Sequence, residues 1–341
     1  YGLSLIYGAT GSTYLAASAR STAGEVSPAA PTLLVALLLA MAGLGFKVAA
    51  VPFHFYAPDV YQGTTNTLAA LLAWVPKAAG FFAMLRLVTF GMPYLAEKTA
   101  WLVFVLSAIT MTTGNVLGLL QNNLRRLFAY SSIAHAGYML IGIGVGAAGG
   151  TRFFMTSGSE SVVFYLVAYA AMTIGAFAVI VYLSSPERPV DTVDDLAGLA
   201  RTNPGIALAM AVFLFSLTGI PITAGFWGKF AIFSSAVSSG HYRYILLAVI
   251  GMVNAAISSY YYLRIIGVMY MQESYTPVRP TGRGKFGPLA VLTSCAFTTI
   301  LVGFVPGPLL NWSRHSDSRS HGATATAHQD ATLLGATNSP R

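Results

Sequence analysis

The chain has 341 residues, of which 55% are hydrophobic and only 9% are charged. Soluble globular domains carry about 25% charged residues, so this composition excludes an ordinary soluble enzyme and indicates a protein that crosses the membrane many times. The net charge of +8 comes from basic residues that lie singly between apolar runs. Such a distribution is typical of membrane topology and predicts no nucleic-acid partner.

Eight complete apolar segments and one partial segment are predicted to form membrane helices. The partial segment covers residues 1–9, and the complete segments lie near 32–52, 66–90, 101–121, 127–147, 161–183, 206–235, 244–271 and 287–310. Because a backbone in lipid must satisfy its own hydrogen bonds, and because the runs lack the alternation of barrel strands, the predicted fold class is all-α. Residues 1–310 are expected to form one transmembrane domain, and residues 311–341 a polar tail without ordered structure.

Two of the predicted membrane helices contain a break. VPFHFYAPD interrupts the first complete segment near Pro52, and LFSLTGIPITAGFWGKF interrupts the sixth near Pro221. A proline inside a helix frees the carbonyl four residues earlier, here those of Val48 and Leu217. A simple kink is one interpretation. The other is an ion site, because broken helices lie near ion sites in transporters and each break has a lysine nearby.

The loops at 53–65, 122–126, 184–204 and 272–286 are predicted to share one side of the membrane. They contain seven basic residues, namely Arg125, Arg126, Arg188, Arg201, Arg279, Arg283 and Lys285. The short loops of the other side contain four, namely Arg20, Lys98, Arg152 and Arg243. Basic residues are enriched in cytoplasmic loops, so the first set is predicted to face the cytoplasm.

Four ionisable residues lie deep in the apolar runs: Lys47, Lys77, His135 and Lys229. A charge at the bilayer centre costs roughly 2.5–3.5 kcal/mol on insertion scales. Snorkelling to the interface is an alternative for Lys47 and Lys229, which lie close to breaks, but it fits Lys77 poorly because that residue is midway along its segment. Burial disfavours the charged form of an amine, so such a lysine can accept and release a proton. A row of these groups that includes His135 would form a proton relay.

His135 has a second interpretation as a structural histidine. Its neighbours Ser131, Ser132 and Tyr138 could hold water or hydrogen-bond its ring nitrogens. Other sites are not predicted. The single cysteine, Cys295, cannot form an iron–sulfur cluster or a Cys-based zinc site alone. GVGAAG at 144–149 matches a dinucleotide motif but follows a membrane helix instead of a strand, so neither cofactor-binding nor metal-binding residues are predicted.

Four stretches together resemble the subunit N family of proton-pumping NADH:quinone oxidoreductases, the respiratory complex I. They are GFKVAAVPFHFYAPDVYQG, WVPKAAGFFAMLRL, NNLRRLFAYSSIAHAGYML and LTGIPITAGFWGKF. The resemblance covers the chain to about residue 310 and implies an antiporter-like helix bundle with two inverted repeats, each containing a broken helix. It implies that Pro52 and Pro221 mark these breaks, and that protons pass through Lys47, Lys77, His135 and Lys229.

The resemblance also implies the setting of the chain. It would be a multi-pass subunit of the bacterial plasma (inner) membrane, surrounded by lipid and by other membrane subunits of the complex. NADH, flavin and iron–sulfur clusters would be held by partner subunits, and quinone would be the substrate of the complex. Two alternatives remain open: a subunit of a Na⁺/H⁺ antiporter, and a structural spacer whose lysines do not conduct.

One expectation concerns the partner of Lys47. Family members have further helices before the position of Tyr1, and one of these carries a glutamate that pairs with the first channel lysine. All acidic residues of the present chain fall in loops, tails, breaks or helix ends. A buried lysine needs a partner or must be neutral much of the time. We therefore expect the carboxylate partner of Lys47 to lie upstream of Tyr1.

Overall fold

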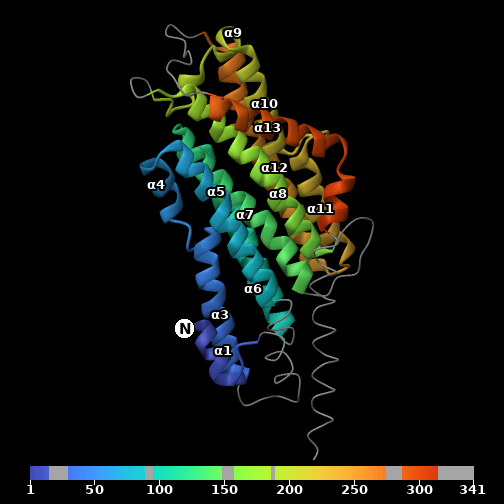
Figure 1. Ribbon diagram of the computed structural model, residues 1–341. Coiled ribbons are helices and arrows are strands. Elements are labelled where there is room, and N and C mark those ends of the chain that lie inside the picture. Colours follow the sequence, from blue (N-terminus) through green and yellow to red (C-terminus); the bar gives the residue numbers. More distant parts are fainter. Residues whose placement is uncertain (15–29, 89–94, 148–156, 186–188, 274–285, 314–341) are drawn as a thin grey trace, which may run out of the picture.

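The computed structural model describes residues 1–14, 30–88, 95–147, 157–185, 189–273 and 286–313. Long helices run side by side in an elongated bundle (Figure 1). They are α1 (Gly2–Thr10), α3 (Ala30–Val48), α4 (Tyr56–Gly63), α5 (Asn66–Arg86), α6 (Ala96–Leu119), α7 (Leu124–Ala147), α8 (Gly158–Leu183), α9 (Leu199–Thr202), α10 (Pro204–Thr218), α11 (Ala224–Ser238), α12 (Tyr242–Met271) and α13 (Phe286–Phe304). Within these residues the all-α prediction is confirmed.

Seven of the described helices are long and apolar enough to cross a membrane: α3, α5, α6, α7, α8, α12 and α13. The predicted segment 206–235 is divided between α10 and α11, which follow one another in the chain. The segment predicted to reach residue 52 ends as a helix at Val48 instead, because residues 49–55 form turns. Residues 89 and 90 of the next predicted segment lie outside the described part.

The most buried span is also the least apolar. Helix α7 has a mean hydropathy of 1.3, the lowest of the seven, and 94% of its apolar window is buried. The corresponding buried share is 67% for α8, but only 39% for α3, α6 and α12. Polar side chains are costly against lipid, and the span with the lowest mean hydropathy is accordingly the one enclosed by the other helices.

Both predicted breaks interrupt the helices. Pro52 lies between α3 and α4, where the backbone N–H of Val51 donates to Thr110 Oγ1 at 3.1 Å and the Tyr56 hydroxyl donates to the Phe46 carbonyl at 2.9 Å. Pro221 lies between α10 and α11. Gly219 ends α10 with φ +93°, a conformation that favours glycine. Non-helical backbone is thus supported by contacts with protein groups at the first break, as lipid requires.

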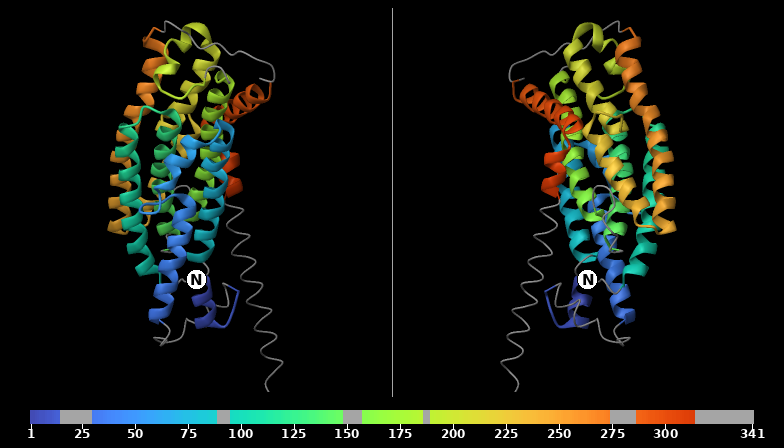
Figure 2. Two further views of the ribbon diagram at one scale, coloured as in Figure 1. Left: turned by 90° about the vertical axis from the view of Figure 1, so that its left-hand side faces the viewer. Right: turned by 90° about the vertical axis from the view of Figure 1, so that its right-hand side faces the viewer.

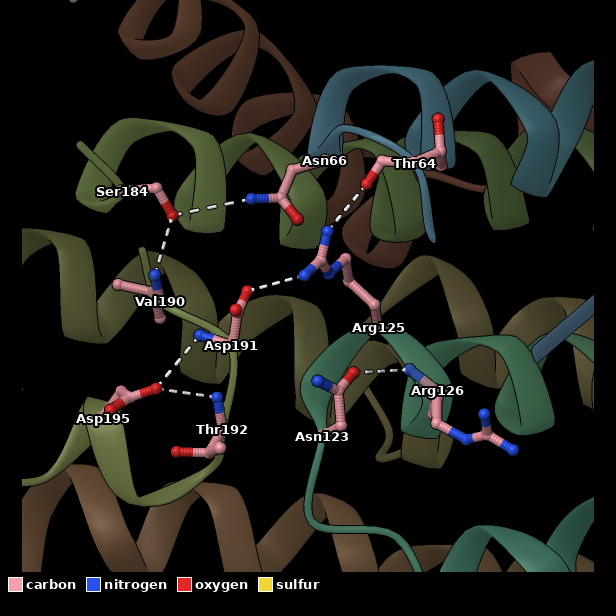
Figure 3. Close-up of polar contacts among 10 residues, drawn as sticks. All are labelled: Thr64, Asn66, Asn123, Arg125, Arg126, Ser184, Val190, Asp191, Thr192 and Asp195. Carbon is pink, nitrogen blue, oxygen red and sulfur yellow. Dashed lines mark hydrogen bonds and ion pairs between the residues drawn. The ribbon is translucent and has the colours of Figure 1, made fainter. Parts of the chain in front are cut away.

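Three of the loops predicted to share a side are joined by polar contacts (Figure 3). The Arg125 guanidinium donates to the Thr64 carbonyl at 2.7 Å and to the Asp191 carboxylate at 2.8 Å. Asn66 Nδ2 donates to Ser184 Oγ at 3.5 Å. These contacts join the loops that precede α5, α7 and α9. Residues 274–285, which make up most of the fourth loop, lie outside the described part.

Helix α13 crosses the other helices obliquely on the outside of the bundle (Figure 2). A short helical stretch at 307–313 follows it, so the first three residues of the predicted tail are helical. The remainder of that tail, 314–341, lies outside the described residues.

Candidate functional site

Lys77 reaches the bundle centre from α5. Its side chain is only 3% exposed, and its ammonium group donates a hydrogen bond to the main-chain carbonyl of Ser132 on α7. The residue lies near the middle of a 21-residue helix. Its amine therefore points into protein and not toward the interface, which disfavours the snorkelling interpretation.

His135 lies on α7 and is 1% exposed. Its Nδ1 is 2.6 Å from the Tyr165 hydroxyl of α8, and its Nε2 is 3.1 Å from the Tyr262 hydroxyl of α12. The Tyr262 hydroxyl is also hydrogen-bonded to Ser131. Both ring nitrogens thus have hydroxyl partners, which can act as donor or acceptor and allow either tautomer.

Lys229 approaches from α11, immediately beyond the second break, and is 5% exposed. Its Nζ donates to the carbonyls of Leu217 at 2.9 Å and Thr218 at 2.8 Å, which end α10. The sequence predicts that Pro221 leaves this Leu217 carbonyl without its helical hydrogen bond. A helix C-terminus carries partial negative charge, and the ring centroid of Tyr138 is 5.2 Å from Nζ. The break therefore creates a site for a cation.

Helix α7 connects these groups. Ser132, His135 and Tyr138 follow one another at intervals of three residues, so they lie along one side of the helix. Ser132 contacts Lys77 through its carbonyl, and Tyr138 contacts Lys229 through its ring. We call the buried row Lys77–His135–Lys229 the polar line.

Lys47 is not part of the polar line. Its side chain is exposed on α3, and among the described residues it makes no hydrogen bond or ion pair. Its stem packs against α5, because a Cβ at Gly80 would lie 3.3 Å from Lys47 Cβ. Among the described residues Lys47 is exposed, and its role in a proton path stays a prediction.

The partners of His135 also differ from the sequence expectation. Ser131, Ser132 and Tyr138 were the expected neighbours of its ring nitrogens, but the hydroxyls that reach them belong to Tyr165 and Tyr262. Sequence reasoning missed both tyrosines. The available signal was a hydroxyl in the middle of an apolar run, as in VVFYLVAYA and SSYYYLR.

Ion pairs in the described part of the chain lie away from the polar line. They join Arg125 to Asp191, Arg126 to Asp59, Arg201 to Glu273 and Arg243 to Glu97. Among the same residues, the hydrogen-bond acceptors of Lys77 and Lys229 are main-chain carbonyls. A carbonyl does not bind an ammonium ion as strongly as a carboxylate does. The described residues include no group of three or more His, Cys, Asp or Glu side chains suited to a metal ion.

Comparisons with known proteins agree with this arrangement. The family described as NADH:quinone oxidoreductase/Mrp antiporter, TM matches residues 1–258. A relative from Trichlorobacter lovleyi, named NADH-quinone oxidoreductase subunit N, is 44% identical over 321 residues, which are 93% of this chain and 62% of that protein. The chain thus spans less than two thirds of the length of the curated relatives it matches.

Solved structures show the same fold. A chain of respiratory complex I from Thermus thermophilus with bound aureothin has a TM-score of 0.74 and 35% identity, covering 91% of this chain and 64% of that one. A chain of the Mrp complex from Dietzia sp. has a TM-score of 0.76 at 22% identity, covering 92% and 63%, and this similarity shows the fold alone.

The apolar helices, the matched family and the bacterial relatives identify a multi-pass protein of the bacterial inner membrane. Its bundle has the antiporter-like architecture, with a broken helix on either side of the central α7. The chain belongs to the family of membrane subunits that NADH:quinone oxidoreductases share with Mrp antiporters.

Proposed function

We propose that this chain is a membrane-arm subunit of a bacterial NADH:quinone oxidoreductase and that it translocates protons along the polar line. The observation that carries the proposal is the burial of Lys77, His135 and Lys229 in one row, linked through α7. Three ionisable groups at membrane depth are costly and mark ion or proton pathways in membrane proteins. The relatives named subunit N support the assignment to this complex.

In this function Lys77 and Lys229 are the proton-accepting amines, and His135 is the relay between them. The hydroxyls of Tyr165 and Tyr262 hold the imidazole and can exchange a proton with either ring nitrogen. Protonation of one lysine disfavours protonation of its neighbours because like charges repel. Movement of charge in a neighbouring subunit can therefore move a proton in this one.

Other membrane subunits and the lipid bilayer are the proposed partners. Electron transfer from NADH to quinone would occur in other subunits, which would hold the flavin and iron–sulfur clusters. Lys47 would take part at the exposed face of α3, where a carboxylate from outside the described residues would accompany it.

Replacement of Lys77 by alanine tests the proposal. We expect Lys77→Ala to impair proton pumping and, because pumping and electron transfer are coupled, quinone-linked NADH oxidation. NADH oxidation by an artificial acceptor should persist, since that chemistry belongs to other subunits. All three rates are measured in membrane vesicles, with Lys98→Ala as the matched control, because Lys98 is an exposed lysine at the start of α6.

The same assay separates the alternatives. Normal pumping by Lys77→Ala and Lys229→Ala in a fully assembled complex would contradict the relay and support a spacer. Proton movement driven by a sodium gradient in the absence of quinone would support a Na⁺/H⁺ antiporter, whose fold the chain shares.

A further inference from the structure

A second cluster of buried polar side chains lies beside the polar line, between α6, α7 and α12. Asn115 of α6 is its central member and is 0% exposed. Asn254, Tyr138 and Tyr261 surround it, each 3% exposed or less. A carboxamide buried in a membrane bundle is costly unless hydrogen-bonded, and nothing in the relay described so far uses Asn115.

The amide of Asn115 contacts both sides of the cluster. Its Nδ2 is 3.1 Å from the Tyr138 hydroxyl, from Asn254 Oδ1 and from the Asn254 carbonyl. Its Oδ1 accepts a hydrogen bond from the Tyr261 hydroxyl at 3.0 Å. Because the amide is fixed by these partners, Tyr138 must accept and Tyr261 must donate. Asn115 therefore hydrogen-bonds to both phenols.

Close helix packing holds Asn115 in this place. It stands in GNVLG, between two glycines that face different neighbours. A Cβ at Gly114 would lie 2.6 Å from the backbone nitrogen of Ala134 on α7, and one at Gly118 would lie 3.4 Å from the Tyr261 ring. Small residues allow membrane helices to approach closely. The Asn115 side chain, which lies between the two glycines, can therefore contact both α7 and α12.

The two tyrosines that bind Asn115 contact different members of the relay. The ring of Tyr138 is 5.2 Å from Lys229 Nζ and 5.7 Å from the His135 ring. The ring of Tyr261 is 4.5 Å from that of Tyr262, whose hydroxyl contacts His135 Nε2. The Asn115 amide therefore supports Tyr138, which faces Lys229. It also supports Tyr261, which packs against Tyr262, the partner of His135.

We propose that Asn115 is a positioning residue of the proton relay, holding Tyr138 against Lys229 and Tyr261 against Tyr262. A carboxamide does not exchange protons at neutral pH, so its contribution is geometric. The inference rests on the proposed function, because it assigns Asn115 a role in the same polar line. Asn254 helps to hold Asn115 in place, because it accepts a hydrogen bond from the Asn115 amide and donates one to Thr112 Oγ1 at 3.3 Å.

The test compares Asn115→Leu with Ser107→Ala in the assembled complex. Leucine is close to asparagine in size but has no hydrogen-bonding group. Ser107 is a matched control, because it is also buried on α6 and donates to α7, at the Gly137 carbonyl, but contacts no member of the polar line. Proton pumping and quinone-linked NADH oxidation are measured across a range of pH, together with the amount of assembled complex.

We expect Asn115→Leu to lower the pumping rate about tenfold and to move its pH optimum, since a small displacement of a reacting group can cost up to about 100-fold. Ser107→Ala should keep the normal rate and pH profile. Tyr138→Phe should cause a similar loss, and the double variant should be no worse than Asn115→Leu alone, because both changes remove the same contact. Additive losses, or an unchanged pH profile, would overturn the proposal.

Two further sets of variants allow the test to decide the role of Asn115 in every case. If Asn115→Leu reduces assembly, Tyr138→Phe and Tyr261→Phe decide the question, because each removes a single oxygen; normal pumping by both would overturn the inference. Lys229→Ala separates the two proposals. If Lys229→Ala pumps normally, the relay itself is contradicted. If Lys229→Ala fails to pump but Asn115→Leu pumps normally, only the role of Asn115 is contradicted.

Discussion

Replacement of Lys229 by arginine distinguishes a proton carrier from a fixed charge. The ammonium group of Lys229 donates to two carbonyls at the end of α10, at 2.8 and 2.9 Å, and faces the Tyr138 ring. A guanidinium can make the same contacts, because it has several donors and binds aromatic faces. The substitution therefore keeps the charge and the type of contact but changes the ease of proton release.

The expected loss follows from that difference. Free arginine and lysine side chains differ in pKa by about 2 to 3 units, which corresponds to about 3 to 4 kcal/mol for proton release. If deprotonation of Lys229 is part of the cycle, pumping should fall about 100-fold or more in Lys229→Arg. Lys98→Arg, at an exposed lysine, is the matched control and should pump normally.

The assay follows the pH gradient in membrane vesicles during NADH oxidation by quinone, and compares it with NADH oxidation by an artificial acceptor. A Lys229→Arg complex that assembles and pumps at the normal rate would refute the reasoning, because a permanently charged group cannot pass a proton on. Lys229 would then act as a fixed countercharge at the C-terminus of α10.

Three further changes test other parts of the structure. Tyr165→Phe removes the hydroxyl at 2.6 Å from His135 Nδ1, and the loss of one hydrogen bond should slow pumping about threefold to tenfold; an unchanged rate in vesicles would argue against the contact. Gly114→Val adds a Cβ that would lie 2.6 Å from the Ala134 backbone, so we expect destabilisation of about 1–3 kcal/mol by thermal unfolding in detergent. Gly267→Ala, with open space around it, should be tolerated. Arg125→Gln breaks the partly exposed pair with Asp191 and should cost about 1 kcal/mol or less; a difference from the wild type that grows with salt would contradict an ionic origin.

The sequence by itself determined the fold class and the position of both breaks. Lipid offers no hydrogen bonds to the backbone, so long apolar runs must be helices. Proline removes an N–H and clashes with the preceding turn, so Pro52 and Pro221 interrupt the helices wherever the bundle places them. Lysines within apolar runs are equally visible, because each is a large cost that only a specific environment can offset.

Only the tertiary structure decided which of these lysines lie together. Apolar residues face lipid on one side of a membrane helix and protein on the other, so the hydrophobic pattern does not identify the inner face. Lys77 and Lys229 point into the bundle and Lys47 does not, although all three lie in similar sequence surroundings. The partners of His135 come from residues 30 and 127 positions away in the chain. Contacts at such separations arise from the packing of α8 and α12 against α7, which no local pattern encodes.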